Sequence, residues 1–149
     1  MFTPTGTNSH MAPEIMQLQS QLSTTSSSSI HVPRMSSMLL SDIWSLGCAI
    51  TEMSSGGTPH YRTAQRPDAR DILLFRLVQD KTTNQNSTLG NAIDQIESSY
   101  TSSCDRDELI NLVRDCFEMD ENTRKSAFCL LNEYESFLGT DEFEEDMEE

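Results

Sequence analysis

Residues 40–53, L-S-D-I-W-S-L-G-C-A-I-T-E-M, form the stretch that decides how the rest of the chain is arranged. Apolar residues recur in it at steps of three and four, the spacing of one face of an α-helix: Ile43, Leu46, Ile50 and Met53. Ser41 or Asp42 stands where a side chain caps a helix N-terminus, and Gly56 and Gly57 stand where a helix ends. With apolar residues on most sides, this segment is predicted to be a core helix around which the other segments pack.

The composition fits one small domain and disfavours two classes of partner. The chain has 149 residues, 36% of them hydrophobic, and a formal net charge of −14. This charge argues against nucleic acid or an anionic membrane as a partner, because both surfaces are negative. Part of the excess lies in Asp141–Glu149, which holds seven acids and no base. Residues 140–149 are therefore predicted to be a disordered acidic tail.

Membrane and secretion signals are not visible in the sequence. Met1–Met11 is polar, unlike a signal peptide, and the most apolar run contains Asp42 and Glu52. The four cysteines form no C-x-x-C pair, and three lie within apolar helix patterns that predict buried, reduced thiols: Cys48, Cys116 and Cys129. Reduced thiols are typical of a cytoplasmic or nuclear protein, so we expect one of these locations.

The remaining segments have the patterns of helices joined by polar loops. Pro13 suits the first turn of a short helix over Ala12–Gln19. Hydroxyl side chains fill Ser23–Ser29, so a flexible Ser-rich loop is predicted at about 21–37. Later helices are predicted at Asp68–Gln79, at Asp105–Phe117 with a capping box of Asp105 and Glu108, and at about Ser126–Leu138, with only a short helical turn at Ala92–Ser98. No strand-period alternation of useful length is visible, so the predicted fold class is all-α without a β-sheet.

Three motifs in a fixed order resemble the end of a eukaryotic protein kinase domain. Gly6-Thr7 followed by Met11-Ala12-Pro13-Glu14 resembles G-T-x-x-x-M-A-P-E, the end of a kinase activation segment. D-I-W-S-L-G-C, at residues 42–48, resembles the central helix of the large lobe. Residues 116–131 resemble C-F-x-x-D-P-x-x-R-P-S-A-x-x-L-L, near the end of the domain.

In their residues, the three motifs resemble most closely those of serine/threonine kinases of the MAP kinase kinase kinase type. The resemblance implies that residues 1–139 form the C-terminal part of a large lobe, with an insertion at about 21–37 and no small lobe. It also implies a buried ion pair between Glu14, the A-P-E glutamate, and Arg124, which would pin the activation segment to the last helices. The alternative for these two residues is a pair of solvated surface charges.

The central helix of the family suggests roles for three further residues. Asp42 matches an aspartate that accepts hydrogen bonds from the backbone of the catalytic loop, which this chain does not contain. Asp42 is therefore expected to serve as an N-cap alone. Trp44 is expected to pack in the core rather than touch a ligand, and Gly47 belongs to the same helix motif.

The first motif implies a surface beside the substrate. Five residues resemble the wall of the site that holds substrate residues near the phosphoacceptor: Gly6, Thr7, Met11, Ala12 and Pro13. Thr7 matches a threonine that helps to distinguish serine/threonine kinases from tyrosine kinases. Thr3 and Thr5 would lie in the activation segment, where a phosphate can order a loop by pairing with arginine. They are candidate phosphorylation sites.

The sequence departs from the family at two turns. Asn8-Ser9-His10 replaces a proline and an aromatic residue before Met11, which bears on the shape of the substrate pocket. Glu121 and Lys125 replace two prolines around Arg124, so this turn is expected to lose rigidity. No metal site is predicted, because the histidines lie in predicted loops without a second ligand at a suitable spacing: His10, His31 and His60.

The motifs that carry phosphoryl transfer are absent from these 149 residues. There is no G-x-G-x-x-G, V-A-I-K, H-R-D or D-F-G, the elements that bind ATP and Mg²⁺ and position the reacting groups. The resemblance therefore implies ATP and Mg²⁺ only for a complete domain. No catalytic residue and no cofactor are predicted in this chain, which is expected to be inactive alone.

Two interpretations stay open at this stage, beside the weaker one of an unrelated helical protein. The chain is either a fragment or truncated gene model of a serine/threonine protein kinase, or a degenerate kinase remnant, a pseudokinase, that acts as an interaction module. We favour the first as a description of ancestry. The expected partners are protein substrates or signalling proteins, with the largely apolar helix at Asp68–Gln79 as the docking surface.

Overall fold

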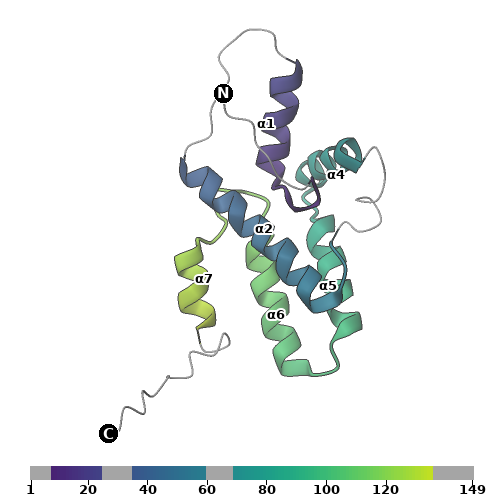
Figure 1. The fold of residues 1–149 in the computed structure, drawn as a ribbon, viewed down its shortest axis with the longest axis vertical. Helices are drawn as coiled ribbons and strands as arrows, with labels where there is room; N and C mark the ends of the chain where they lie inside the picture. The colour runs from purple at the N-terminus through teal and green to yellow at the C-terminus, as the bar shows by residue number, and fades with distance from the viewer. Residues whose placement is uncertain (1–7, 25–34, 60–68, 136–149) are drawn as a thin grey trace, which may run out of the picture.

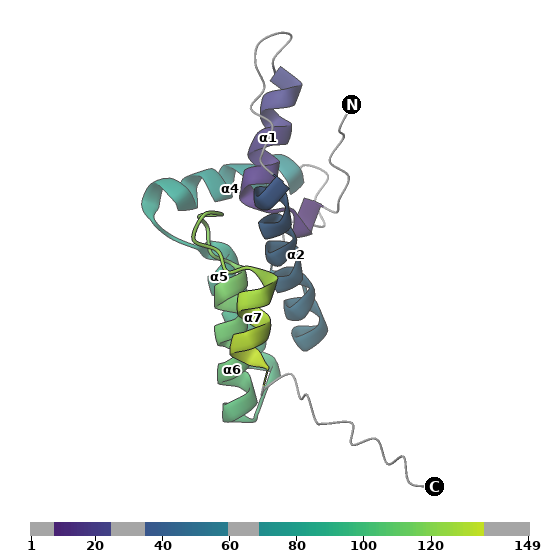
Figure 2. The ribbon, with the colours of Figure 1, turned by 90° about the vertical axis from the view of Figure 1, so that its left-hand side faces the viewer.

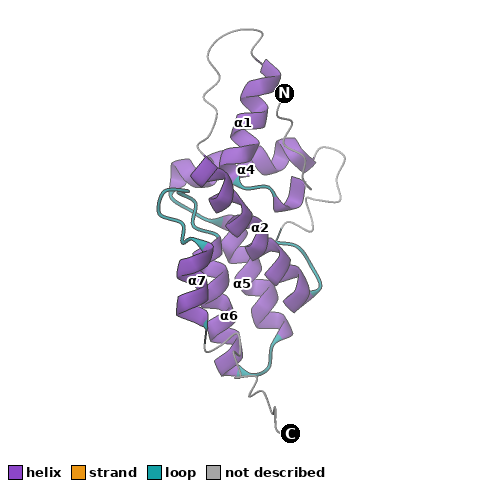
Figure 3. Cartoon of the chain, turned by 60° about the vertical axis from the view of Figure 1, so that its left-hand side comes forward, coloured by secondary structure: helices purple, strands orange, loops and turns teal. Residues whose placement is uncertain are grey.

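The computed structural model describes residues 8–24, 35–59 and 69–135, and within these ranges it is all-helical, as predicted (Figure 1; Figure 3). The expectations for Thr3, Thr5, Gly6, Thr7 and the tail at 140–149 lie outside the described residues. The elements in chain order are the 3-10 helix η1 (Asn8–His10), α1 (Pro13–Thr24), α2 (Met35–Ser55), α4 (Ala69–Thr83), α5 (Ser87–Ser99), α6 (Ser103–Cys116) and α7 (Ala127–Tyr134).

Helix α2 runs through the middle of the bundle (Figure 1; Figure 2). Figures 1 and 2 show α1 extending beyond one end of the bundle, with α4 crossing near that end, while α5, α6 and α7 lie beside the rest of α2. Helix α2 packs against η1, α5 and α6, and α7 packs against α6. The predicted organisation around this helix is therefore confirmed for η1, α5 and α6, whereas α1 packs against α4, and α4 against η1 and α5.

The core forms where α2 meets α6. Trp44 is completely buried, and its ring meets Phe117 edge-on with 5.0 Å between the ring centroids. A Cβ at Gly47 would lie 2.7 Å from Cys116 Cβ, closer than such atoms pack, so only glycine permits this approach of α6 to α2. A second apolar cluster fixes α7 to the same two helices: Ile43, Leu112, Cys116, Leu130 and Tyr134.

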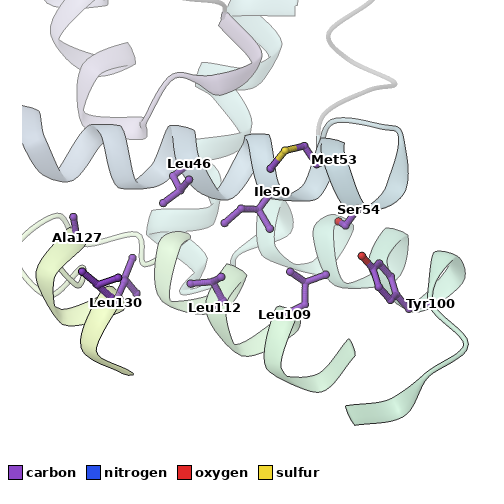
Figure 4. Close-up of a pocket in the computed structure, with 10 residues that line it drawn as sticks. Leu46, Ile50, Met53, Ser54, Tyr100, Leu109, Leu112, Ala127 and Leu130 are labelled. Carbon is purple, nitrogen blue, oxygen red and sulfur yellow. The ribbon is translucent and has the colours of Figure 1, made fainter. Parts of the chain in front are cut away.

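The predicted start of α2 was wrong, and the core covers the helix on only part of its circumference. The helix begins at Met35, upstream of Ser41 and Asp42, because methionine and leucine at positions 38–40 are good helix formers that continue it. Neither Ser41 nor Asp42 is therefore an N-cap. One side of the helix also stays open, since Leu46 is 42% exposed and Met53 is 80% exposed, and both line a pocket between α2, α6 and α7 (Figure 4). The predicted end is confirmed: Gly56 has a φ of +74°.

The loop predicted at about 21–37 is shorter than expected within the described residues. Helix α1 continues to Thr24 and α2 begins at Met35, so both ends of that range are helical, and residues 25–34 lie outside the described part. Helix α4 also runs one turn past the predicted Gln79. The hydroxyls of Thr82 and Thr83 bond to carbonyls of the preceding turn, which satisfies these polar side chains within the helix.

Helix α5 is longer than predicted. The sequence predicted a polar loop there with only one short helical turn, at Ala92–Ser98, whereas the helix runs from Ser87 to Ser99. Asn86 caps it by accepting a hydrogen bond from the Leu89 N–H at 3.0 Å, and its Nδ2 donates to the Phe117 carbonyl at 2.6 Å. A narrow stripe at every fourth position is buried: Thr88, Ala92 and Ile96. Its surrounding polar residues concealed this stripe in the sequence.

Helices α6 and α7 lie where they were predicted, but their caps, the end of α7 and one cysteine differ. Helix α7 ends at Tyr134, whereas the prediction continued to Leu138, and residues 136–138 lie outside the described part. Helix α6 begins at Ser103, so Asp105 lies in its first turn and the predicted capping box with Glu108 was wrong. Helix α7 is capped by Ser126, whose Oγ accepts a hydrogen bond from the Cys129 N–H at 3.3 Å. Cys48 and Cys116 are buried as predicted, but Cys129 is exposed, because α7 turns only Leu130 and Tyr134 inward.

Candidate functional site

The residues that link the two ends of the described chain are Glu14, at the start of α1, and Arg124, in the loop before α7. Arg124 Nη1 lies 2.8 Å from Glu14 Oε1, and Nη2 lies 3.2 Å from Oε2, so the pair is bidentate. The Arg124 side chain is 0% exposed and that of Glu14 12%. The structure thus brings together two residues that are 110 positions apart.

Arg124 has three further contacts that fix its orientation. Its Nε donates to the Glu118 carbonyl and its Nη1 to the Leu40 carbonyl, each at 2.8 Å. The guanidinium carbon lies 5.3 Å from the centroid of the Trp44 ring, within the range of a cation–π contact. The carboxylate is shared as well, since Ser41 Oγ donates to Glu14 Oε1 at 2.8 Å.

We call this set of residues the clamp: Glu14, Leu40, Ser41, Trp44, Glu118 and Arg124. It joins α1, α2 and the loop between α6 and α7 through a buried positive charge with a charged partner and two carbonyl acceptors. A buried guanidinium is stable only when its charge and its N–H groups are satisfied, so the three segments must dock together.

A second set of contacts holds the segment before α1 along α2. Ser45 Oγ donates to the His10 carbonyl at 2.8 Å, and Cys48 Sγ lies 3.6 Å from the Ser9 carbonyl. His10 Nε2 lies 2.8 Å from Glu52 Oε1. The sequence predicts His10 only as an isolated loop histidine. Its pairing with Glu52 could not be predicted, because the partners are 42 positions apart and no motif joins them.

The residues expected to wall a substrate pocket fall into two groups. Met11, Ala12 and Pro13 are buried, with Met11 and Ala12 in the main core cluster, whereas Gly6 and Thr7 lie outside the described residues. Asp42 is exposed on α2. The indole Nε1 of Trp44 is buried and has no hydrogen-bond partner within the described ranges.

The turn around Arg124 is held by polar contacts where the family has prolines. Lys125 Nζ donates to Asp115 Oδ2 at 2.8 Å and to Glu133 Oε2 at 2.5 Å, and these hydrogen bonds raise the pKa of Lys125. Tyr134 OH donates to the same Asp115 oxygen at 2.8 Å. Burial, with this hydrogen bond, raises the pKa of Tyr134. Lys125 therefore connects α6 to α7. Its position, where the family has a proline, had predicted only a loss of rigidity in this turn.

Two of the cysteines, Cys48 and Cys116, are buried. Burial raises the pKa of Cys48, and it raises that of Cys116 to about 12, so neither thiol is ionised at neutral pH. No group of three or more His, Cys, Asp or Glu side chains within the described ranges is arranged to hold a metal ion. The described side chains therefore do not fit the Mg²⁺ that a complete kinase domain uses.

Comparison with known proteins agrees with the order of the motifs. The model of the family described as protein kinase domain matches residues 1–134, which is most of the chain. This chain belongs to the protein kinase domain family. No curated protein and no solved structure matches it. Within the described ranges, no helix has both the length and the apolar character needed to cross a membrane.

Proposed function

We propose that this chain forms the helical base of the large lobe of a serine/threonine protein kinase of the MAP kinase kinase kinase type. Phosphoryl transfer from ATP to protein serine or threonine belongs to the complete domain. The clamp carries this proposal, because the bidentate contact between Glu14 and Arg124 joins the A-P-E glutamate to the last helices. Its role is to fix the end of the activation segment on α2. The reduced thiols of Cys48 and Cys116 support a cytoplasmic or nuclear location.

The choice of serine and threonine over tyrosine rests on the motif alone. Gly6 and Thr7 precede Met11-Ala12-Pro13-Glu14 with the spacing that serine/threonine kinases use. Assaying a longer product that contains H-R-D and D-F-G, with matched peptides that differ only in the acceptor, tests this part. Phosphate on serine or threonine is expected, and transfer to tyrosine alone would contradict it.

The 149 residues by themselves are proposed to bind no Mg-ATP. The phosphate- and metal-binding motifs are absent from the sequence, and the described side chains offer no grouping suited to a metal ion. Thermal unfolding with increasing Mg-ATP tests this, because a ligand that binds only the folded state must raise the melting temperature. We expect no shift beyond that given by Mg²⁺ alone. A rise that grows with ATP concentration would contradict the proposal.

A second candidate function is that of a kinase remnant acting as an interaction module through α4. The observation that favours it is exposure: Phe75 is 68% and Val78 45% exposed on α4, whereas Leu73 and Leu77 on its other side are buried. An exposed aromatic beside an aliphatic side chain suits a protein contact. The expected partners are protein substrates or signalling proteins.

Two experiments separate these functions. Mapping the 5′ end of the transcript distinguishes them first: a reading frame encoding H-R-D and D-F-G upstream of Met1 supports the kinase, and a start at Met1 favours the remnant. Quantitative co-purification then compares the parent chain with Phe75→Lys and with Phe128→Lys, a matched control on α7 whose side chain is 71% exposed. Partners lost only with Phe75→Lys support docking through α4, and partners retained by that variant argue against it.

A further inference from the structure

We draw no further inference here: the strongest candidate, the polar cavity lined by carboxylates and amides between the end of α4, the start of α5 and the loop at 118–122, carries nothing, because an acidic cluster alone does not define a binding site and its buried carboxylate, Asp80, already accepts hydrogen bonds from the N–H and the hydroxyl of Ser87.

Discussion

Removing either charge of the clamp is expected to destabilise the fold strongly. Glu14→Ala leaves the guanidinium of Arg124, which is 0% exposed, without its carboxylate partner. Stranding one member of a buried ion pair costs about 3–5 kcal/mol. Glu14 is itself 12% exposed, and Arg124 keeps the carbonyls of Leu40 and Glu118, so we expect the lower end, about 3 kcal/mol.

Arg124→Ala is expected to cost more than Glu14→Ala. It strands the carboxylate of Glu14 and also removes the donor from two carbonyls, and each buried acceptor left unsatisfied costs about 1–3 kcal/mol. The contact with Trp44 is lost as well. The total free energy of unfolding of a domain is about 5–15 kcal/mol, so this variant is expected to be close to unfolding at room temperature.

Urea unfolding followed by fluorescence measures both losses directly. Trp44 is the sole tryptophan in the chain and is completely buried in the clamp, so its emission reports on this region. Asp107→Ala is the matched control, because Asp107 pairs with Arg106 at the surface and its side chain is 67% exposed. The control is expected to change stability by less than about 0.5 kcal/mol. If Glu14→Ala and Arg124→Ala fell within the same margin, the reasoning about the clamp would be refuted.

Three further predictions concern packing, pH and thiol access. Gly47→Ala is expected to lower the free energy of unfolding in urea, because overpacking against Cys116 Cβ at 2.7 Å costs about 1–3 kcal/mol and outweighs the roughly 1 kcal/mol gained in helix propensity; equal stability would contradict this. The hydrogen bonds of Lys125 raise its pKa, so its contribution to stability is complete below about pH 10 and is lost as the pH rises through the folded-state pKa. Lys125→Met is therefore expected to flatten the decline of the melting temperature at alkaline pH. An unchanged decline would count against this prediction. A thiol reagent is expected to label two cysteines quickly in the folded chain and the other two only after unfolding, the fast pair being Cys104 and Cys129 and the slow pair Cys48 and Cys116; fast labelling of all four would contradict the packing.

The sequence was most informative where a motif joined distant residues. The helix over residues 40–53 has an apolar period, so its existence and its end at Gly56 could be predicted. The contact between Glu14 and Arg124 could be anticipated only through the order of the kinase motifs, because composition and periodicity say nothing about residues 110 positions apart.

What the sequence did not reveal has local physical causes. Helix α5 was missed because its buried stripe of Thr88, Ala92 and Ile96 is narrow, and its polar side chains bind other segments: Gln95 Nε2 donates to the Thr58 carbonyl and Asn91 Nδ2 to the Pro59 carbonyl. Such partners exist only after the chain has folded. The contact of His10 with Glu52 was missed for the same reason.

The exposed side of α2 shows a different limit. The period of α2 identified the apolar residues on this side, yet the same period predicted that they would be buried. Leu46 and Met53 are apolar and helical in phase with Ile43, but α6 and α7 cover only part of that face. Whether a residue in phase is covered depends on how far its neighbours reach, and a single-helix pattern does not contain that information.

Hydrogen exchange on the 149-residue chain tests most directly whether α2 is the buried centre of a large-lobe base closed by the clamp. The slowest amides are expected in α2 from Trp44 to Cys48 and at the end of α6 from Val113 to its C-cap Phe117. These segments meet in the core and open only when the whole fold opens. Arg124→Ala is expected to speed exchange in both segments together. Exchange in α2 as fast as in an unfolded peptide, or no response to Arg124→Ala, would contradict the account.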